Sequence, residues 1–143
     1  MAEQDETPIS TDSMTAITVP AAELRSRLKA VIPHAGIDDT PPSLTCVRFE
    51  LRTGSLYLVT TDRYTMAVAR LRIAGTQAAP VPDQAALLPM PAVKALRRMI
   101  KGADVVALAI GDGTLTIDSR GTGQSCTWDT QPGKFPDWRP MLH

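Results

Sequence analysis

Two stretches of the chain repeat their apolar residues with the spacing of an amphipathic helix. The first begins at Pro20, which suits a first helical turn because its missing N–H would have no partner there, and it runs to about Ile32, before Pro33. The second begins at Pro91 and ends near Gly102. The residues expected on the buried faces are Leu24, Leu28, Val31 and Ile32 in the first helix and Val93, Leu96, Met99 and Ile100 in the second.

Strand patterns fill most of the remaining sequence. Residues 46–52 alternate, which predicts a half-buried strand with Val47, Phe49 and Leu51 on one side and Cys46, Arg48, Glu50 and Arg52 on the other. Turn signals occur at Thr53-Gly54, Thr61-Asp62-Arg63 and Gly111-Asp112-Gly113, and residues 74–85 are expected to form a loop. The other expected strands are Thr15–Val19, Ser55–Thr60, Tyr64–Ile73, Ala86–Met90, Val105–Ile110, Thr114–Asp118 and Gln124–Thr130.

This order of elements is β-α-β-β-β-β-α-β-β-β. The strand groups between the helices have an antiparallel, meander character, which does not fit the repeated βαβ units of a nucleotide-binding fold. The sequence therefore predicts an α+β fold in which two helices pack as one layer on one side of antiparallel β-sheet.

Length and composition set the scale of this fold. The 143 residues suffice for one globular domain, assigned to residues 15–143, and with only 4% aromatic residues its core must be aliphatic. Residues 1–14 are polar and acidic and are expected to be a flexible tail, with Met14 as an alternative start.

There is no apolar run long enough to cross a bilayer and no secretory signal, which predicts a cytoplasmic protein without a membrane partner. Cys46 and Cys126 are expected to be buried, reduced thiols.

The net charge of zero hides an asymmetry. The tail holds Glu3, Asp5, Glu6 and Asp12 and no basic residue, so the rest of the chain has 15 basic against 11 acidic residues and a net charge of +4. Seven of the 15 basic residues lie on the two helices, where Glu23 is the one acid. These seven residues, the candidate DNA contacts, are Arg25, Arg27, Lys29, Lys94, Arg97, Arg98 and Lys101.

A charged helix face is more often simply solvated. Solubility alone, however, would accept Glu as readily as Lys, and mixed signs would allow pairing between residues four apart. Two helices of one sign in the same layer instead favour a polyanion such as duplex DNA, whose charges recur every ~1.7 Å along the axis. Few aromatic residues and no base-reading motif predict contacts to the DNA backbone without sequence preference.

Three sequence motifs follow one another along the chain. They are Pro42-Ser43-Leu44 before Val47-Arg48-Phe49-Glu50, residues 56–67 (LYLVTTDRYTMA), and Phe135-Pro136-Asp137-Trp138-Arg139 near the end of the sequence. The first two are similar to the P-x-L-x-G-V and L-x-L-V-A-T-D-x-x-R-L-A core, and the third to the closing F-P-D-Y-R segment, of the β subunit of bacterial DNA polymerase III, the replicative sliding clamp. The chain most closely resembles the middle domain of that family, over roughly residues 15–143.

The resemblance implies a ring of six similar domains with helices lining the central hole, and partner peptides that dock beside the T-D-x-x-R-L loop. DNA polymerase or repair proteins carrying such peptides are the implied partners, together with duplex DNA and other copies of the chain. The implied peptide-binding residues are Thr61, Asp62, Arg63, Tyr64, Thr65, Met66, Pro136 and Met141. Thr65 stands where the family often has Arg, and the chain stops where the middle domain would lead into the third, which supplies part of the pocket.

Other classes of function remain as alternatives. An enzyme has little support, because His34 and His143 form no pair with a nucleophile, there is no phosphate-binding loop, and Asp38-Asp39 is more typical of a loop than of a metal site. Neither a cofactor nor a metal is expected. A decoy or regulator that occupies clamp partners without encircling DNA fits the length of one domain.

Overall fold

The computed structural model describes residues 15–37, 42–52, 54–73, 84–133 and 135–136. The expected tail over residues 1–14, most of the expected loop over residues 74–85, and Met141 lie outside these ranges.

The strands form two antiparallel sheets of four strands each. The first has the order β1-β6-β7-β8 and the second the order β4-β3-β2-β5. The strands of the first sheet are β1 (Thr15–Pro20), β6 (Val105–Gly111), β7 (Thr114–Arg120) and β8 (Gln124–Asp129). Those of the second are β2 (Cys46–Arg52), β3 (Ser55–Thr61), β4 (Met66–Arg72) and β5 (Gln84–Pro89).

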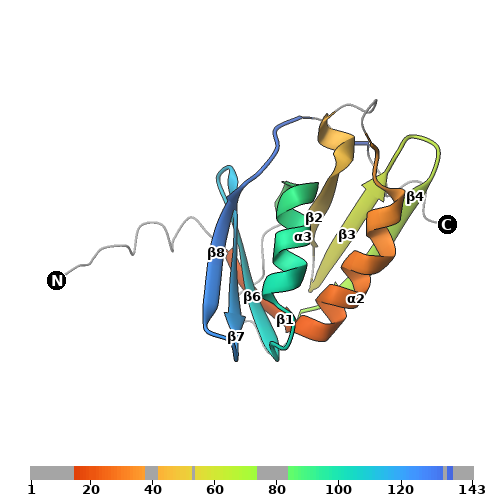
Figure 1. Cartoon of the computed structure of the whole chain (residues 1–143). Coiled ribbons are helices and arrows are strands. Elements are labelled where there is room, and N and C mark those ends of the chain that lie inside the picture. The colour runs from red at the N-terminus through yellow and green to blue at the C-terminus, as the bar shows by residue number, and fades with distance from the viewer. Residues whose placement is uncertain (1–14, 38–41, 53, 74–83, 134, 137–143) are drawn as a thin grey trace.

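Two α-helices, α2 (Ala21–Val31) and α3 (Met90–Met99), lie next to each other on the same side of the strands (Figure 1). Short 3₁₀ helices follow α2 (η1, Ile32–His34) and precede β2 (η2, Pro42–Thr45). The guanidinium Nε of Arg25 in α2 donates a hydrogen bond to the carbonyl oxygen of Arg97 in α3 at 3.3 Å, so the two helices are in contact. The predicted α+β fold with one layer of two helices is confirmed.

Several predicted boundaries differ from the structure by a few residues. Pro20 ends β1 with an extended ψ of 132°, so α2 begins one residue later, whereas α3 begins one residue before Pro91. At its other end α3 stops at Met99 rather than near Gly102, and Gln84 and Ala85, expected in the loop, begin β5. Tyr64 and Thr65 were expected in a strand but lie in the turn before β4. Asp62 causes this shift, because its carboxylate accepts backbone hydrogen bonds from both residues and holds them out of the strand.

The core lies between the helix layer and the inner faces of both sheets, and it is almost entirely aliphatic. Val47, Phe49 and Leu51 are buried as predicted, as are Leu24, Leu28 and Val31 of α2 and Val93 and Leu96 of α3 with the following Ile100. Ile32 and Met99, expected on the buried faces, are only partly buried and pack at the edge of the core. Cys126 is also only partly buried, because it lies on the edge strand β8, whereas Cys46 is buried; both are free thiols.

Residues 46–52 were predicted to form a half-buried strand, but β2 is covered on both faces. Cys46 is buried as expected, whereas Glu50, expected on the open face, is only 3% exposed, because β2 is an inner strand and long side chains cover its outer face. The Glu50 carboxylate lies 2.8 Å from Arg48 Nε and 3.8 Å from Arg52 Nε. The Arg48 guanidinium in turn lies over the ring of Phe135, 5.6 Å from its centroid. The chain after β8 therefore crosses to the outer face of the second sheet.

We expect Leu28→Ala to lower the free energy of unfolding by about 2–5 kcal/mol, because it removes a fully buried side chain and leaves a cavity between α2 and the sheet. Ile37→Ala is the matched control, since Ile37 is 78% exposed, and it should change stability by no more than about 0.5 kcal/mol. Urea unfolding of both variants tests the core assignment. Equal losses would contradict it.

Candidate nucleic-acid and partner interface

The contact between α2 and α3 creates a basic groove, an open depression of about 340 Å³ on the helix layer. Its described lining consists of five cationic side chains from the two helices: Arg25, Lys94, Arg97, Arg98 and Lys101. No acidic residue belongs to that lining; Glu23 and Asp104, which are nearby in the fold, are exposed and lie outside it. The groove is thus a concave surface of a single sign of charge, which concentrates the field above it.

The sequence periodicity accounts for this arrangement. The apolar stripe of α3 is buried against the sheets, so Lys94, Arg98 and Lys101, which lie opposite the stripe, are exposed. Arg97 lies on the flank and is half-buried, and its Nε atom is shielded from solvent without a hydrogen-bond acceptor among the described residues.

Two of the seven predicted DNA contacts are not brought into the groove. Arg27 Nε donates a hydrogen bond to the carbonyl oxygen of Arg70 at 3.4 Å, which holds its side chain over β4. Lys29 is exposed near the end of α2 and does not belong to the groove's described lining.

The turn between β3 and β4 is held together by two side chains. Asp62 Oδ1 accepts hydrogen bonds from the backbone N–H of Tyr64 at 2.9 Å and of Thr65 at 2.7 Å. The Thr61 hydroxyl accepts from the N–H of Arg63 at 3.1 Å and donates to the carbonyl oxygen of Thr65 at 2.7 Å. The N–H groups of Thr65 and then of Tyr64 lower the pKa of the Asp62 carboxyl, because they stabilise its ionised form.

This geometry separates the predicted peptide-binding residues by exposure. Arg63, Tyr64 and Thr65 project from the turn, and Tyr64 is 90% exposed, while Thr61 is buried and Met66 half-buried. Arg63 adopts a φ of 84°, a left-handed conformation that ordinarily favours glycine. Pro136 is exposed, and its predicted companion Met141 lies outside the described residues.

An apolar depression of about 470 Å³ lies beside the chain that follows η1 and beside η2. Its described lining includes Ile37, Cys46, Pro89 and Met90 and none of residues 61–66. The 3₁₀ helix η1 connects the two features, because His34 Nδ1 lies 3.4 Å from the hydroxyl of Thr65 and the N–H of Gly36 bonds to the carbonyl oxygen of Leu44 at 2.8 Å.

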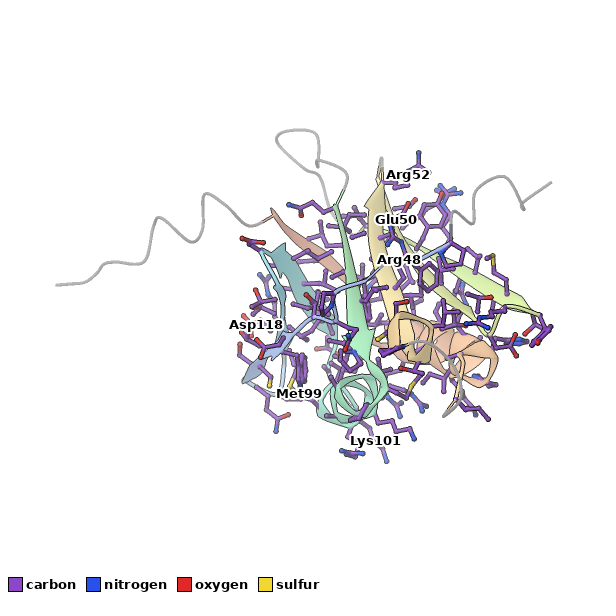
Figure 2. The ribbon with its side chains drawn as sticks, turned by 90° about the horizontal axis from the view of Figure 1, so that it is seen from above. Arg48, Glu50, Arg52, Met99, Lys101 and Asp118 are labelled. Carbon is purple, nitrogen blue, oxygen red and sulfur yellow. The ribbon has the colours of Figure 1, made fainter. Side chains whose placement is uncertain are left out.

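Sequence reasoning missed a second cationic surface, on the outer face of the β4-β3-β2-β5 sheet. In the strand register, Ser55 of β3 lies between Arg52 of β2 and Arg72 of β4, and Tyr57 of β3 lies between Glu50 of β2 and Arg70 of β4. The side chains of these residues therefore share one face of the sheet. Figure 2 shows Arg48, Glu50 and Arg52 on the side of the molecule away from Lys101 of α3. The alternating arginines of β2 and β4 signalled this surface, but the strand order was needed to bring them together.

Within the described residues, no group of three or more His, Cys, Asp or Glu side chains is placed to hold a metal ion. No helix in that part of the chain is long and apolar enough to cross a membrane.

Comparison with known proteins bears on the basic groove and on the β3–β4 turn. A family model described as "DNA polymerase III beta subunit, central domain" matches residues 18–137, which include both helices, the groove and the turn. The chain belongs to this family. The beta sliding clamp of Streptomyces coelicolor is 32% identical over 128 residues, which are 87% of this chain and 34% of that protein.

Solved structures share the fold of this clamp domain. The DNA polymerase sliding clamp of Bacillus subtilis matches with a TM-score of 0.76 at 15% identity, over 90% of this chain and 33% of that one. The DNA polymerase III beta subunit of Thermotoga maritima matches with a TM-score of 0.73 at 20% identity, over 87% and 32% of the two chains. A putative beta subunit from Eubacterium rectale gives 0.77 at 14% identity, over 90% and 34%. The chain thus spans about a third of the length of these relatives.

We expect Asp62→Ala to loosen the turn of this clamp domain while leaving its core intact, because the N–H groups of Tyr64 and Thr65 lose their acceptor. Amide exchange at these two residues should accelerate, and exchange at Leu58 in the core of β3 should not.

Lowering the pH should loosen the turn in the same way as the substitution. Since the folded-state pKa is lowered, the carboxylate's contribution is present above its unfolded-state pKa and is lost as the pH falls through the folded-state value. Unchanged exchange at Tyr64 and Thr65 would contradict this role.

Proposed function

We propose that this clamp domain is a non-enzymatic module that contacts the backbone of duplex DNA through the basic groove and supports processive DNA replication. The observation that carries the proposal is the convergence of five cations from two helices in one concave surface whose described lining contains no acid. Phosphates are the most abundant linear array of negative charge in the cell, and Arg and Lys bind them without reading sequence. We also propose that the protein acts in the cytoplasm.

The chemistry of the groove favours backbone contacts. Lys94, Arg98 and Lys101 are exposed and keep their charged ends in water, where each can neutralise one phosphate. Arg25 and Arg97 are partly buried and hydrogen-bonded or packed at the helix contact, so they define the floor of the groove. Lys29 and Arg27, at the edge of the helix layer, extend the positive field beyond the groove.

A second part of the proposal concerns peptides from DNA polymerase or repair proteins. We infer that they dock at the exposed turn of Arg63, Tyr64 and Thr65, where a large aromatic side chain lies open to solvent on a hydrogen-bonded, preorganised scaffold. The apolar depression bordered by Ile37 and Met90 offers an adjacent surface for apolar side chains of such a peptide. Asp62 and Thr61 stabilise the turn through their hydrogen bonds, and Met66 begins the strand that follows it.

A third part of the proposal concerns association between copies of the chain. The edge strands of the two sheets, β1 and β8 in the first and β4 and β5 in the second, each pair on one side only within their sheets. Open edges of this kind can accept another strand, so we propose that copies of the chain associate through them. The solution mass, measured by light scattering over a concentration series, decides between this association and a monomer.

The alternative is a decoy that binds clamp partners without encircling DNA. The two functions predict opposite behaviour toward DNA. A decoy keeps its affinity for clamp-binding peptides and binds DNA negligibly, whatever the charge of the groove.

For the clamp function we expect duplex DNA binding that weakens linearly on a log–log plot against salt. About four phosphate contacts correspond to a slope near −3.6, and each lost contact should reduce its magnitude by ~0.9. Lys94→Glu with Arg98→Glu should therefore weaken binding severely and flatten the slope. Arg72→Glu, which reverses an exposed cation on β4, is the control and should leave the slope nearly unchanged. Indistinguishable curves for the wild type and the double variant would favour the decoy.

For partner docking we expect a clamp-binding peptide to shift the amide signals of residues 61–66 in a titration of the labelled chain. Tyr64→Ala should weaken this binding without a change in stability, because the side chain is 90% exposed. The double variant in the groove serves as the control, since its turn is intact and its peptide affinity should match the wild type. A response confined to residues remote from the turn would show that the peptide docks elsewhere.

A further inference from the structure

The basic groove has a second candidate anion within the same chain. Residues 1–14 contain Glu3, Asp5, Glu6 and Asp12 and no basic residue, so this segment has a formal charge of −4. Acidic segments at chain termini commonly act as interaction tails. We propose that the acidic N-terminal segment docks in the groove between α2 and α3, where it occupies the cations that DNA would contact.

The length of the segment is sufficient for three of its four acids. From Thr15 to Arg25 the chain passes along β1 and one turn of α2, a path of at most ~26 Å for strand and helix rises. Glu6 is nine residues from Thr15 and reaches ~30 Å, and Glu3, at 12 residues, reaches ~40 Å. Asp12 is tethered within ~10 Å of Thr15, at the end of β1 that is remote from α2. Glu3, Asp5 and Glu6 are therefore the docking residues.

The groove is a better site for these carboxylates than the cationic outer face of the second sheet. On that face Glu50 already lies between Arg48 and Arg52 and neutralises part of their charge. The described lining of the groove contains no such acid. The Arg97 guanidinium belongs to this lining, and a carboxylate matches a guanidinium in geometry as well as charge.

Tethering makes a weak contact effective. The docking acids are joined to Thr15 through nine to twelve residues, and a flexible tether of this length gives an effective concentration on the order of millimolar. A dissociation constant of about 1 mM for the contact then fills the groove in about half of the molecules. DNA binds to the remaining open fraction, and its apparent affinity falls in proportion. If the segment is docked in about 50–90% of molecules, neutralising it should tighten DNA binding about twofold to tenfold. This competition rests on the proposed DNA contact, whereas the docking itself does not.

The docking is tested first without DNA, on the full chain. Glu6→Lys and Asp12→Lys make the same change of charge, six residues apart. We expect Glu6→Lys to shift the amide signals of Arg25, Lys94 and residues 97–101 at low salt, and these shifts to fade at about 0.5 M salt, where the Debye length falls to only ~4 Å. Asp12→Lys should leave the groove signals unchanged. Equal effects of both variants, no effect on the groove, or shifts around residues 48–52 instead would each overturn the proposal.

The competition is tested next with the triple variant E3Q/D5N/E6Q, with Asp12→Asn as control. The triple variant should bind duplex DNA about twofold to tenfold more tightly at low salt, and the control should match the wild type. Tighter DNA binding without any change at the groove amides would mean simple repulsion between segment and DNA, and would overturn the docking. If no form of the chain binds DNA while the groove shifts persist, the proposed DNA contact fails and the docking stands.

Discussion

The architecture depends on the packing of two like-charged helices side by side against the two sheets. Coulomb repulsion between two unit charges 4 Å apart is ~1 kcal/mol in water and ~4 kcal/mol near a protein surface, so the crowding of cations opposes this contact. Each leucine, valine or isoleucine that the helices bury contributes about 1.5–3 kcal/mol in the other direction. With Leu24, Leu28, Val31, Val93, Leu96 and Ile100 fully buried, the apolar contribution wins.

The helix backbones also lower the electrostatic free-energy cost of placing these cations close together. Arg97 and Arg98 lie in the last turn of α3 and Lys29 in the last turn of α2, where the partial negative charge of the helix end favours a cation. The carbonyl oxygen of Arg97 accepts a hydrogen bond from Arg25 across the helix contact. The groove is therefore positive at its surface, and the partial negative charges of the helix ends and of the Arg97 carbonyl oxygen offset part of that charge at its floor.

Short-range patterns predicted much of this structure, because helix stripes and turn chemistry are local properties. The apolar spacing of α2 and α3 predicted which side of each helix is buried, and hence which cations are exposed. The division of eight strands into two sheets was beyond such patterns, since the pairing of β1 with β6 joins residues at opposite ends of the chain. For the same reason the burial of Glu50 was missed: it depends on which strands flank β2 and on what crosses its outer face. At the candidate site, Arg27 was grouped with the other helix cations, although periodicity puts it on the opposite flank of the α2 apolar stripe from Arg25 and Lys29. In the structure its hydrogen bond to the Arg70 carbonyl oxygen holds it over β4.

The register of β1 has a consequence for how the chain is made. Pro20 lies opposite Val105, so the first strand has no partner until 85 residues after its last have been synthesised. At a translation rate of ~5–20 residues per second this takes about 4–17 seconds, far longer than a helix or a hairpin needs to form. During that interval β2, β3 and β4 can form their meander while Ile17 and Val19, which end fully buried, remain without their sheet. Closure of the first sheet is thus the late step of folding, and the chain is most exposed to aggregation or chaperone capture before β6 emerges from the ribosome.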